Sequence, residues 1–293
     1  MTKIDTTYET SGAAHLLLDG LEKCWRKYTG QLKICREEFS NEAVHDLRVA
    51  TRRMMAIIRL LHAIAPHPRL QKIIRTLKKQ LDEFDDLRDT QVILAEVSEA
   101  VQQLPKLLAF QKYEQRQELQ LLREVRKQIR KFDTKVLTRR IRETRDSIQA
   151  SDNELLETEI LQAVDDAFMI AKQRLELVDT NRPPTIHRVR IAFKTFRYMV
   201  EIIYPLLKEY PADLLKNMHD YQSLMGEVQD AEIFIQTLSE FSEHASTTDH
   251  GRICRYYEHR HTEAIAAYAQ SMNHLHIFWR SGPSQPFPWE KPA

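Results

Sequence analysis

Two stretches of this chain carry the same pattern: residues 44–61 read VHDLRVATRRMMAIIRLL, and residues 186–203 read IHRVRIAFKTFRYMVEII. The aligned pairs are Val44 with Ile186, His45 with His187, Arg48 with Arg190, Val49 with Ile191, Ala50 with Ala192, and Arg52 with Lys194. In both stretches apolar residues recur three and four positions apart, which is the period of an α-helix. The sequence therefore predicts two related helices that belong to an internal repeat.

The helical period continues along most of the chain. Breaker residues divide it into expected helices near residues 13–38, 42–64, 69–101, 106–144, 152–179, 185–208, 212–243 and 250–280. Long helices with short connections favour antiparallel bundles. We predict an all-α fold of two antiparallel four-helix bundles, residues 1–150 and 151–281, related by a pseudo-two-fold axis. A proline-rich tail, residues 282–293, is expected to be unstructured or to pack as an extended strap.

Local signals mark the starts of the two repeated helices. Ser40 and Asn41 are suited to cap the first, because a short polar side chain can accept a hydrogen bond from a free N–H of the first turn. Pro183 and Pro184 are suited to open the second, since proline lacks the N–H that a helix start leaves unused.

The composition excludes several classes of protein. The 293 residues carry a net charge of +1, and 42% of them are hydrophobic, as is typical of a folded globular protein. Only six glycines occur, with no GxxxxGK[ST] or GxGxxG run, which argues against a nucleotide-binding loop. The three cysteines match no zinc or redox spacing, so we expect reduced thiols. No apolar run approaches the ~18 residues of a membrane span, and the polar start lacks a signal core, so we expect a cytoplasmic protein with no membrane partner.

Each repeated helix carries a row of positive side chains. On a helical wheel the apolar core arcs are Leu47, Ala50, Met54, Ile57, Ile58 and Leu61 in the first copy, and Val189, Ala192, Phe196, Met199, Val200 and Ile203 in the second. A different side of each helix holds what we call the first basic row, His45, Arg48, Arg52 and Arg59, and the second basic row, His187, Arg190, Lys194 and Arg197. Spacings of three, four and seven stack these side chains along one face.

The two rows favour a polyanion ligand over a plain solvated face. A solvated face normally mixes charge signs, because like charges at these spacings repel by ~0.2–0.5 kcal/mol per pair. Neither row holds a carboxylate before Glu201. Forked guanidinium donors suit a chain of phosphates, which would supply the countercharge. The third expected helix adds further basic residues, Arg75, Lys78 and Lys79, and the corresponding helix of the second half has only Lys216 and His219. For Lys78 and Lys79, ligand contact and simple solubility stay open as equal alternatives.

The same residues give little support to a metal site or to catalysis. Neither His45 nor His187 has a second histidine, cysteine or carboxylate three or four positions later. Asp89 and Asp230, at corresponding positions of the repeat, are expected to orient arginines or to cap a helix rather than to catalyse a reaction. We find no constellation of carboxylates that would gather Mg²⁺ for hydrolysis. The sequence therefore predicts a binding protein without enzymatic activity, metal or cofactor.

The doubled motif H-x-x-R-[VI]-x-x-[RK], present as HDLRVATRR from His45 and HRVRIAFK from His187, resembles the CHAD domain, the conserved histidine α-helical domain. The LRD sequence at residues 87–89 is also similar to that family, and the resemblance covers nearly the whole chain. It implies two four-helix bundles whose basic faces form a central groove or pore. It further implies binding of inorganic polyphosphate and targeting to polyphosphate granules, without turnover.

The resemblance assigns polyphosphate contact to His45, Arg48, Arg52, Arg53, His187, Arg190, Lys194 and Arg197. Together with the charge argument and the LRD match, the full set of expected binding residues adds Arg59, Arg75, Lys78, Lys79, Arg88, Lys216 and His219. The chain departs from the family at Met55, where a basic residue is common, at Asp85, where a glycine is usual, and at Gln229, where a second arginine is expected. These departures weaken the expected anion site at one edge.

Three other functions compete with polyphosphate binding. RNA or DNA binding normally adds aromatic platforms, but Phe193 and Phe196 fall on or beside the core arc. A metal-dependent polyphosphate or triphosphate hydrolase would need acidic residues that the pattern does not supply. A purely structural helical scaffold would make both basic rows irrelevant to binding. The sequence does not determine an oligomeric state or a preferred polyphosphate chain length.

Overall fold

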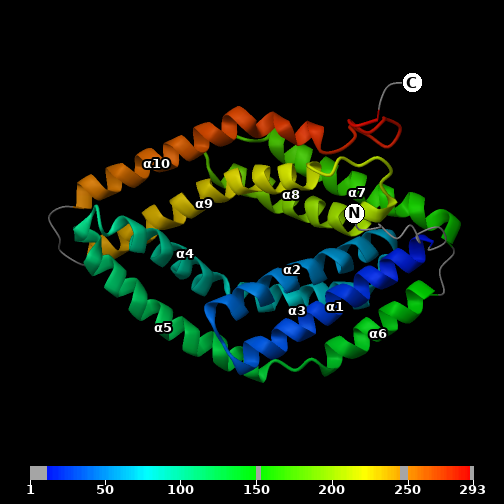
Figure 1. Ribbon diagram of the computed structural model, residues 1–293, viewed down its shortest axis with the longest axis horizontal. Coiled ribbons are helices and arrows are strands. Elements are labelled where there is room, and N and C mark those ends of the chain that lie inside the picture. Colours follow the sequence, from blue (N-terminus) through cyan, green and yellow to red (C-terminus); the bar gives the residue numbers. More distant parts are fainter. Residues whose placement is uncertain (1–11, 150–152, 245–249, 291–293) are drawn as a thin grey trace, which may run out of the picture. The chain divides into compact units, whose positions relative to one another are not determined.

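The computed structural model describes residues 12–149, 153–244 and 250–290, shown in Figure 1. The fold is 84% helical, and the described residues form no β-strand, which confirms the predicted all-α class. The helices are α1 Ala13–Glu37, α2 Asn41–Ile64, α3 Pro68–Asp82, α4 Asp85–Ala100, α5 Leu108–Lys131, α6 Lys135–Gln149, α7 Asn153–Glu176, α8 Pro184–Ile203, α9 Leu214–His244 and α10 His250–Ser271, with short 3-10 helices at Pro105–Leu107, Tyr204–Leu206 and Met272–Ile277. In these ranges no helix is both long and apolar enough to cross a bilayer.

Two of the expected helices are each divided in two. The expected helix 69–101 breaks at Glu83 and Phe84, where the Phe84 N–H donates to the Leu81 carbonyl at 2.9 Å. Phe84 is only 1% exposed, so the turn places its ring in the core. The expected helix 106–144 breaks at residues 132–134, and the Asp133 carboxylate accepts from the Lys135 N–H at 2.9 Å as α6 begins. Apolar spacing continues across both breaks, so the period alone could not reveal them.

The predicted starts of α2 and α8 are confirmed, but the predicted end of α8 is wrong. The Ser40 hydroxyl accepts from the Ala43 N–H at 3.1 Å and caps α2. Pro184 is the first residue of α8. The helix ends at Ile203 rather than 208 because Pro205 cannot donate a helical hydrogen bond, and Tyr204–Leu206 forms a 3-10 turn instead.

The chain divides into two compact units. Unit 1 comprises Met1–Lys79, Phe132–Asp166 and Tyr198–Tyr210, and unit 2 comprises Gln80–Lys131, Ala167–Arg197 and Pro211–Ala293. These units do not coincide with the expected halves 1–150 and 151–281, because each draws segments from both halves. The relation between the halves as repeated four-helix bundles stays a prediction.

Unit 1 has its core where α1 packs along α2 and against α6. The predicted core arc of α2 is confirmed, since its six residues, Leu47, Ala50, Met54, Ile57, Ile58 and Leu61, are all buried. The first basic row lies outside this arc, although its member Arg48 is also buried.

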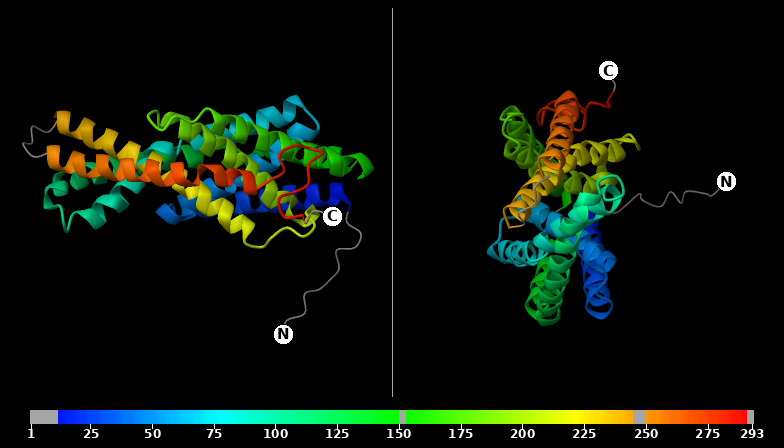
Figure 2. Two further views of the ribbon diagram at one scale, coloured as in Figure 1. Left: turned by 90° about the horizontal axis from the view of Figure 1, so that it is seen from above. Right: turned by 90° about the vertical axis from the view of Figure 1, so that its left-hand side faces the viewer.

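Unit 2 has two apolar clusters. In Figures 1 and 2, α9 and α10 run side by side, and α4 packs against both α5 and α9. The first cluster joins Ile93, Val97, Leu107, Phe110, Phe234, Leu238, Ile253 and Tyr257. The second contains Phe193 and Phe196, both fully buried, with ring contacts to Tyr221, Phe278 and Trp279. The expectation that these two phenylalanines face the core is confirmed.

The proline-rich tail packs on unit 2 as far as it is described. The Phe287 ring stacks on Trp289, with centroids 4.7 Å apart, and contacts Trp279 at 4.8 Å. Arg280 lies over the Phe287 ring at 4.8 Å. Of the two expectations for the tail, packing is thus the one that describes residues 282–290, although these residues form turns rather than an extended strap. Residues 291–293 lie outside the described residues.

Candidate functional site

The second basic row lies in unit 2, on one face of α8. His187, Arg190 and Lys194 are half-buried, and Arg197 is 8% exposed. These side chains are therefore held against neighbouring helices and are not a freely solvated face.

Helix α9 meets the second basic row with neutral amides. The Gln229 Oε1 accepts a hydrogen bond from Nη1 of Arg190 at 3.0 Å and lies 2.9 Å from Nδ1 of His187. Nε of Arg197 donates to the Gln222 Oε1 at 3.1 Å. Because an amide oxygen only accepts, His187 must carry a hydrogen on Nδ1 to complete its bond.

Gly226 makes room for Arg190 on the same face of α9. A Cβ atom at Gly226 would lie 3.4 Å from Nη2, 3.7 Å from Nε and 4.0 Å from Cζ of Arg190. Any side chain longer than a methyl group would therefore compete with the guanidinium for space. Gln222, Gly226 and Gln229 recur at helical spacing, so one face of α9 orients the row.

One carboxylate lies among the cations of this site. Desolvation raises the pKa of Asp230, and the positive charges of Arg190, Arg88 and Lys194 act in the opposite direction without reversing it. The residue as a whole is exposed, so water still reaches it. Arg88 on α4, one of the expected binding residues, thus lies close to Asp230 beside the second basic row. From the sequence, Asp230 is expected to orient arginines or to cap a helix, and the structure places it on α9 within electrostatic range of Arg190, Arg88 and Lys194.

Two further predicted residues of unit 2 lie at the start of α9. Lys216 and His219 are both exposed, and Nδ1 of His219 lies 3.6 Å from a carboxylate oxygen of Asp220. His219 therefore has an acidic partner within the protein, and its expected role in binding stays a prediction.

The first basic row lies in unit 1, on α2, with uneven exposure. His45 is exposed, Arg52 and Arg59 are half-buried, and Arg48 is only 4% exposed. Desolvation lowers the pKa of Arg59. The row therefore does not present four equal charges to solvent, and Arg52 and His45 are its more accessible members.

Arg53 is placed differently from the first basic row. It lines a cavity of about 820 Å³ in unit 1 together with Cys24, Tyr198 and Glu201. Burial raises the pKa of the Cys24 thiol, and the charge of Arg53 opposes that shift.

On α3, the predicted residues Arg75, Lys78 and Lys79 are all exposed. Their exposure is compatible with either ligand contact or simple solubility.

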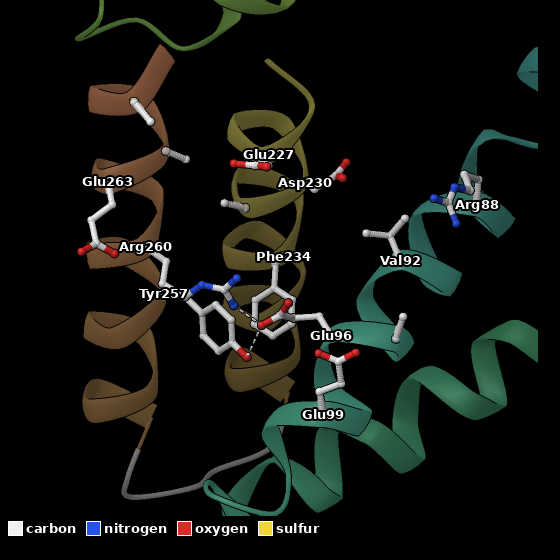
Figure 3. Close-up of a pocket in the computed structure, with 14 residues that line it drawn as sticks. Arg88, Val92, Glu96, Glu99, Glu227, Asp230, Phe234, Tyr257, Arg260 and Glu263 are labelled. Carbon is white, nitrogen blue, oxygen red and sulfur yellow. Dashed lines mark hydrogen bonds and ion pairs between the residues drawn. The ribbon is translucent and has the colours of Figure 1, made fainter. Parts of the chain in front are cut away.

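A second cavity, of about 580 Å³, lies in unit 2 among α4, α9 and α10. Figure 3 shows Asp230 on α9 and Arg88 on α4 on its upper right side, so this cavity adjoins the second basic row. Glu96 accepts hydrogen bonds from Arg260 and from the Tyr257 hydroxyl on its lower side. The cavity is lined by Arg88, Val92, Ala95, Glu96, Glu99, Glu227, Asp230, Ala231, Phe234, Tyr257, Arg260, Glu263, Ala264 and Ala267.

Sequence reasoning missed Gln222, Gly226 and the role of Gln229. Gly226 carried a usable signal, because glycine inside a helix costs about 1 kcal/mol relative to alanine and its presence there indicates a close approach. Gln222 carried no comparable signal, since a glutamine on a helix is ordinary. From the sequence, Gln229 is recognisable only as a departure from the family pattern.

Comparisons with known proteins agree on the fold. A crystal structure of the CHAD domain from the plant Ricinus communis superposes with a TM-score of 0.66 at 17% identity, covering 92% of this chain and 90% of that one. PptA from Streptomyces chartreusis superposes with a TM-score of 0.59 at 16% identity, covering 90% of this chain and 100% of that one. No curated protein matches the sequence. The family model of the CHAD domain matches residues 19–239, which is more than half of the chain, so this chain belongs to the CHAD domain family.

Proposed function

We propose that this protein binds inorganic polyphosphate through its two basic rows. The observation that carries the proposal is the second basic row, in which Gln229 on α9 accepts a hydrogen bond from Arg190 and lies within hydrogen-bonding distance of His187. Helix α9 thereby holds two basic side chains of α8 in a fixed direction, beside Lys194 and Arg88, which also lie close to Asp230. Such a group of oriented donors suits an anionic ligand.

The chemistry of the rows suits a chain of phosphates. Arginine offers forked donors that grip two oxygens, and lysine adds a point charge. In unit 2 we assign phosphate contact to Arg190, Lys194, Arg88 and the neighbouring His187. In unit 1 we assign it to His45 and Arg52, which are the more accessible members of the first basic row. Buried Arg48 and Arg197 are better placed to support their neighbours.

The proposal includes binding without turnover, and association with polyphosphate granules in the cytoplasm. Asp230 lies among three cations, where a carboxylate can hold guanidinium groups in position. We assign no catalytic residue. Incubation with polyphosphate and Mg²⁺ or Mn²⁺ should release no phosphate, and release that disappears in Asp89→Asn would contradict this part. A fluorescent fusion should colocalise with granules and lose that localisation when the second basic row is neutralised.

The direct test is titration of the purified protein with polyphosphate of defined length across a salt series. We expect affinity to fall steeply with salt, because each cation–phosphate contact releases counterions. Competition distinguishes the ligand class: RNA or DNA at equal phosphate concentration should displace little polyphosphate. Equal displacement by nucleic acid would contradict a selective polyphosphate site. Unchanged binding after Arg190→Ala would contradict the assignment of this row.

A further inference from the structure

Helix α5 buries one acid in unit 2 that neither basic row uses. Glu114 is only 2% exposed, and its Oε1 atom is buried with no hydrogen-bond partner in the described part of the chain. A glutamate is almost never buried in this way unless a partner accompanies it. The buried oxygen therefore needs something that the neighbouring side chains do not supply.

The residues beside Glu114 on α5 pack against α9. Phe110, one turn earlier, has its ring centroid 5.8 Å from that of Phe234 and 5.3 Å from that of Phe241. Tyr113 contacts the same Phe241 ring, with centroids 5.2 Å apart. Because residues four positions apart share a helix face, Glu114 lies on the face that Phe110 buries. Aromatic rings of this kind solvate a negative charge poorly.

The polar side chains of α4 near Glu114 are engaged by other residues of α5. The Ser98 Oγ accepts a hydrogen bond from Nε2 of Gln111 at 3.1 Å, about one turn before Glu114. Nε2 of Gln91 lies 3.5 Å from Oε1 of Glu118, about one turn after it. These neutral side chains of α4 thus bond on either side of Glu114, and Glu118 is itself an acid.

The charged group that acts on Glu114 from α9 is a second acid, Glu240. Glu240 is exposed and accepts a hydrogen bond from Nε2 of Gln236 at 3.0 Å, so water and an amide stabilise its carboxylate. Burial first, and the negative charge of Glu240 second, raise the pKa of Glu114 to about 7. Protonation of Glu114 removes both costs, since a neutral carboxyl has no charge to desolvate or to repel.

We propose that Glu114 binds a proton in the folded protein at neutral pH, and that release of this proton at alkaline pH loosens the packing of α5 against α4 and α9. An ionised Glu114 has to be hydrated, which requires water to enter between these helices. The contact is therefore a pH-sensitive device within unit 2. The inference goes beyond polyphosphate binding and does not rest on it, because neither Glu114 nor Glu240 belongs to a basic row.

The direction of the effect on stability follows from which state holds the proton. A glutamate in the unfolded chain keeps its ordinary pKa of 4.5, whereas the pKa of Glu114 in the folded chain is about 7. Between these values the folded state holds a proton that the unfolded state has released, so the free energy of unfolding falls as pH rises. The contribution of Glu114 is fully present below pH 4.5 and is lost as pH rises through about 7.

Carbon-13 NMR of the full chain with labelled glutamate carboxyl groups tests the proton directly. We expect one glutamate resonance with a titration midpoint near pH 7, and we expect it to be absent in Glu114→Gln. In Glu240→Gln the midpoint should move to lower pH, because one cause of the shift is removed while burial remains. Titration of every glutamate below about pH 6, or a resonance near pH 7 that persists in Glu114→Gln, would overturn the proposal. An unchanged midpoint in Glu240→Gln would overturn the role of that acid.

Amide hydrogen exchange followed by mass spectrometry tests the loosening of α5. From about pH 6 to about pH 9, after correction for the intrinsic exchange rate, protection of residues 108–118 should fall about tenfold in the parent chain. Glu114→Gln should keep this protection within about twofold over the same range, since its side chain does not titrate. Glu124→Gln, which alters an exposed carboxylate of the same helix, is the matched control and should behave as the parent does. Constant protection in the parent, or an equal fall in Glu114→Gln, would contradict the proposed device.

Discussion

The two basic rows share a motif, but their surroundings differ. On α8, Arg190 fits against Gly226 and shares the Gln229 oxygen with His187. On α2, His45 is exposed and Arg48 is only 4% exposed. The motif thus determines which face of each helix is positive, whereas the neighbouring helix determines which charges remain within reach of a ligand.

This difference implies unequal contributions to binding. The second basic row is oriented by α9 before any ligand arrives, so less side-chain entropy is lost on binding. Arg52 of the first row is half-buried, and we assign it no comparable orienting partner. We therefore expect substitutions in the second basic row to cost more affinity than matched substitutions in the first.

The largest expected effect is that of Lys194→Glu. This change replaces an attraction by a repulsion and adds a second carboxylate near Asp230, so polyphosphate affinity should fall by about 30-fold and the salt dependence should become shallower. Arg52→Glu should cost about tenfold in the same titration. If the two losses were equal, the proposed advantage of a pre-oriented row would be wrong.

Lys127→Glu on α5 is the matched control for net charge. Lys127 is exposed and belongs to neither row. Affinity should stay within about twofold of the parent at moderate salt, because screening weakens distant charges. A loss as large as that of Lys194→Glu would mean that the ligand responds only to overall charge.

The next effect concerns the space at Gly226. Gly226→Leu should displace the Arg190 guanidinium from α9 and weaken polyphosphate binding by about tenfold. Gly226→Ala is the control, since a methyl group 3.4 Å from Nη2 is an ordinary contact. It should retain binding and raise helix stability by up to ~1 kcal/mol, read as a higher midpoint in urea unfolding. Equal binding by both variants would show that the position of Arg190 does not matter.

A smaller effect is expected at Gln229. Gln229→Met keeps the length of the side chain but removes the acceptor shared by His187 and Arg190. Affinity should fall by about threefold to fivefold, through loss of orientation rather than of charge, so the salt slope should stay the same. A changed slope would instead mean that Gln229 affects the number of phosphate contacts.

Much of the fold follows from local signals in the sequence. The apolar period predicts helices α2 and α8, and Ser40 predicts where α2 begins. Both signals depend only on residues that are close together in the chain. The break at Phe84 is not visible in this way, since a phenylalanine fits the helical period as well as the turn. Tertiary packing decided between them.

The site was predictable only in part for a related reason. The basic rows lie on single helices, so their spacing can be read directly. Gln222 and Asp230 act on the second basic row from α9, and no pattern in the sequence states which helix faces α8. Arg53 shows the converse, because the family resemblance assigns it to the binding residues together with Arg52, yet it lines a cavity with Cys24.

The smallest and most discriminating effect is expected for Asp230→Asn, because unit 2 places this acid beside its basic row. Asparagine retains an oxygen that can accept from Arg190 or Arg88, so the cations should keep their positions while one negative charge is removed. Polyphosphate should then bind about twofold to threefold more tightly, with a slightly steeper salt dependence. Glu243→Gln, which removes the charge of another exposed acid of α9, serves as the control. Weaker binding in Asp230→Asn alone would show that the charge of Asp230 is needed to hold the cations, and that the second basic row is organised by an acid after all.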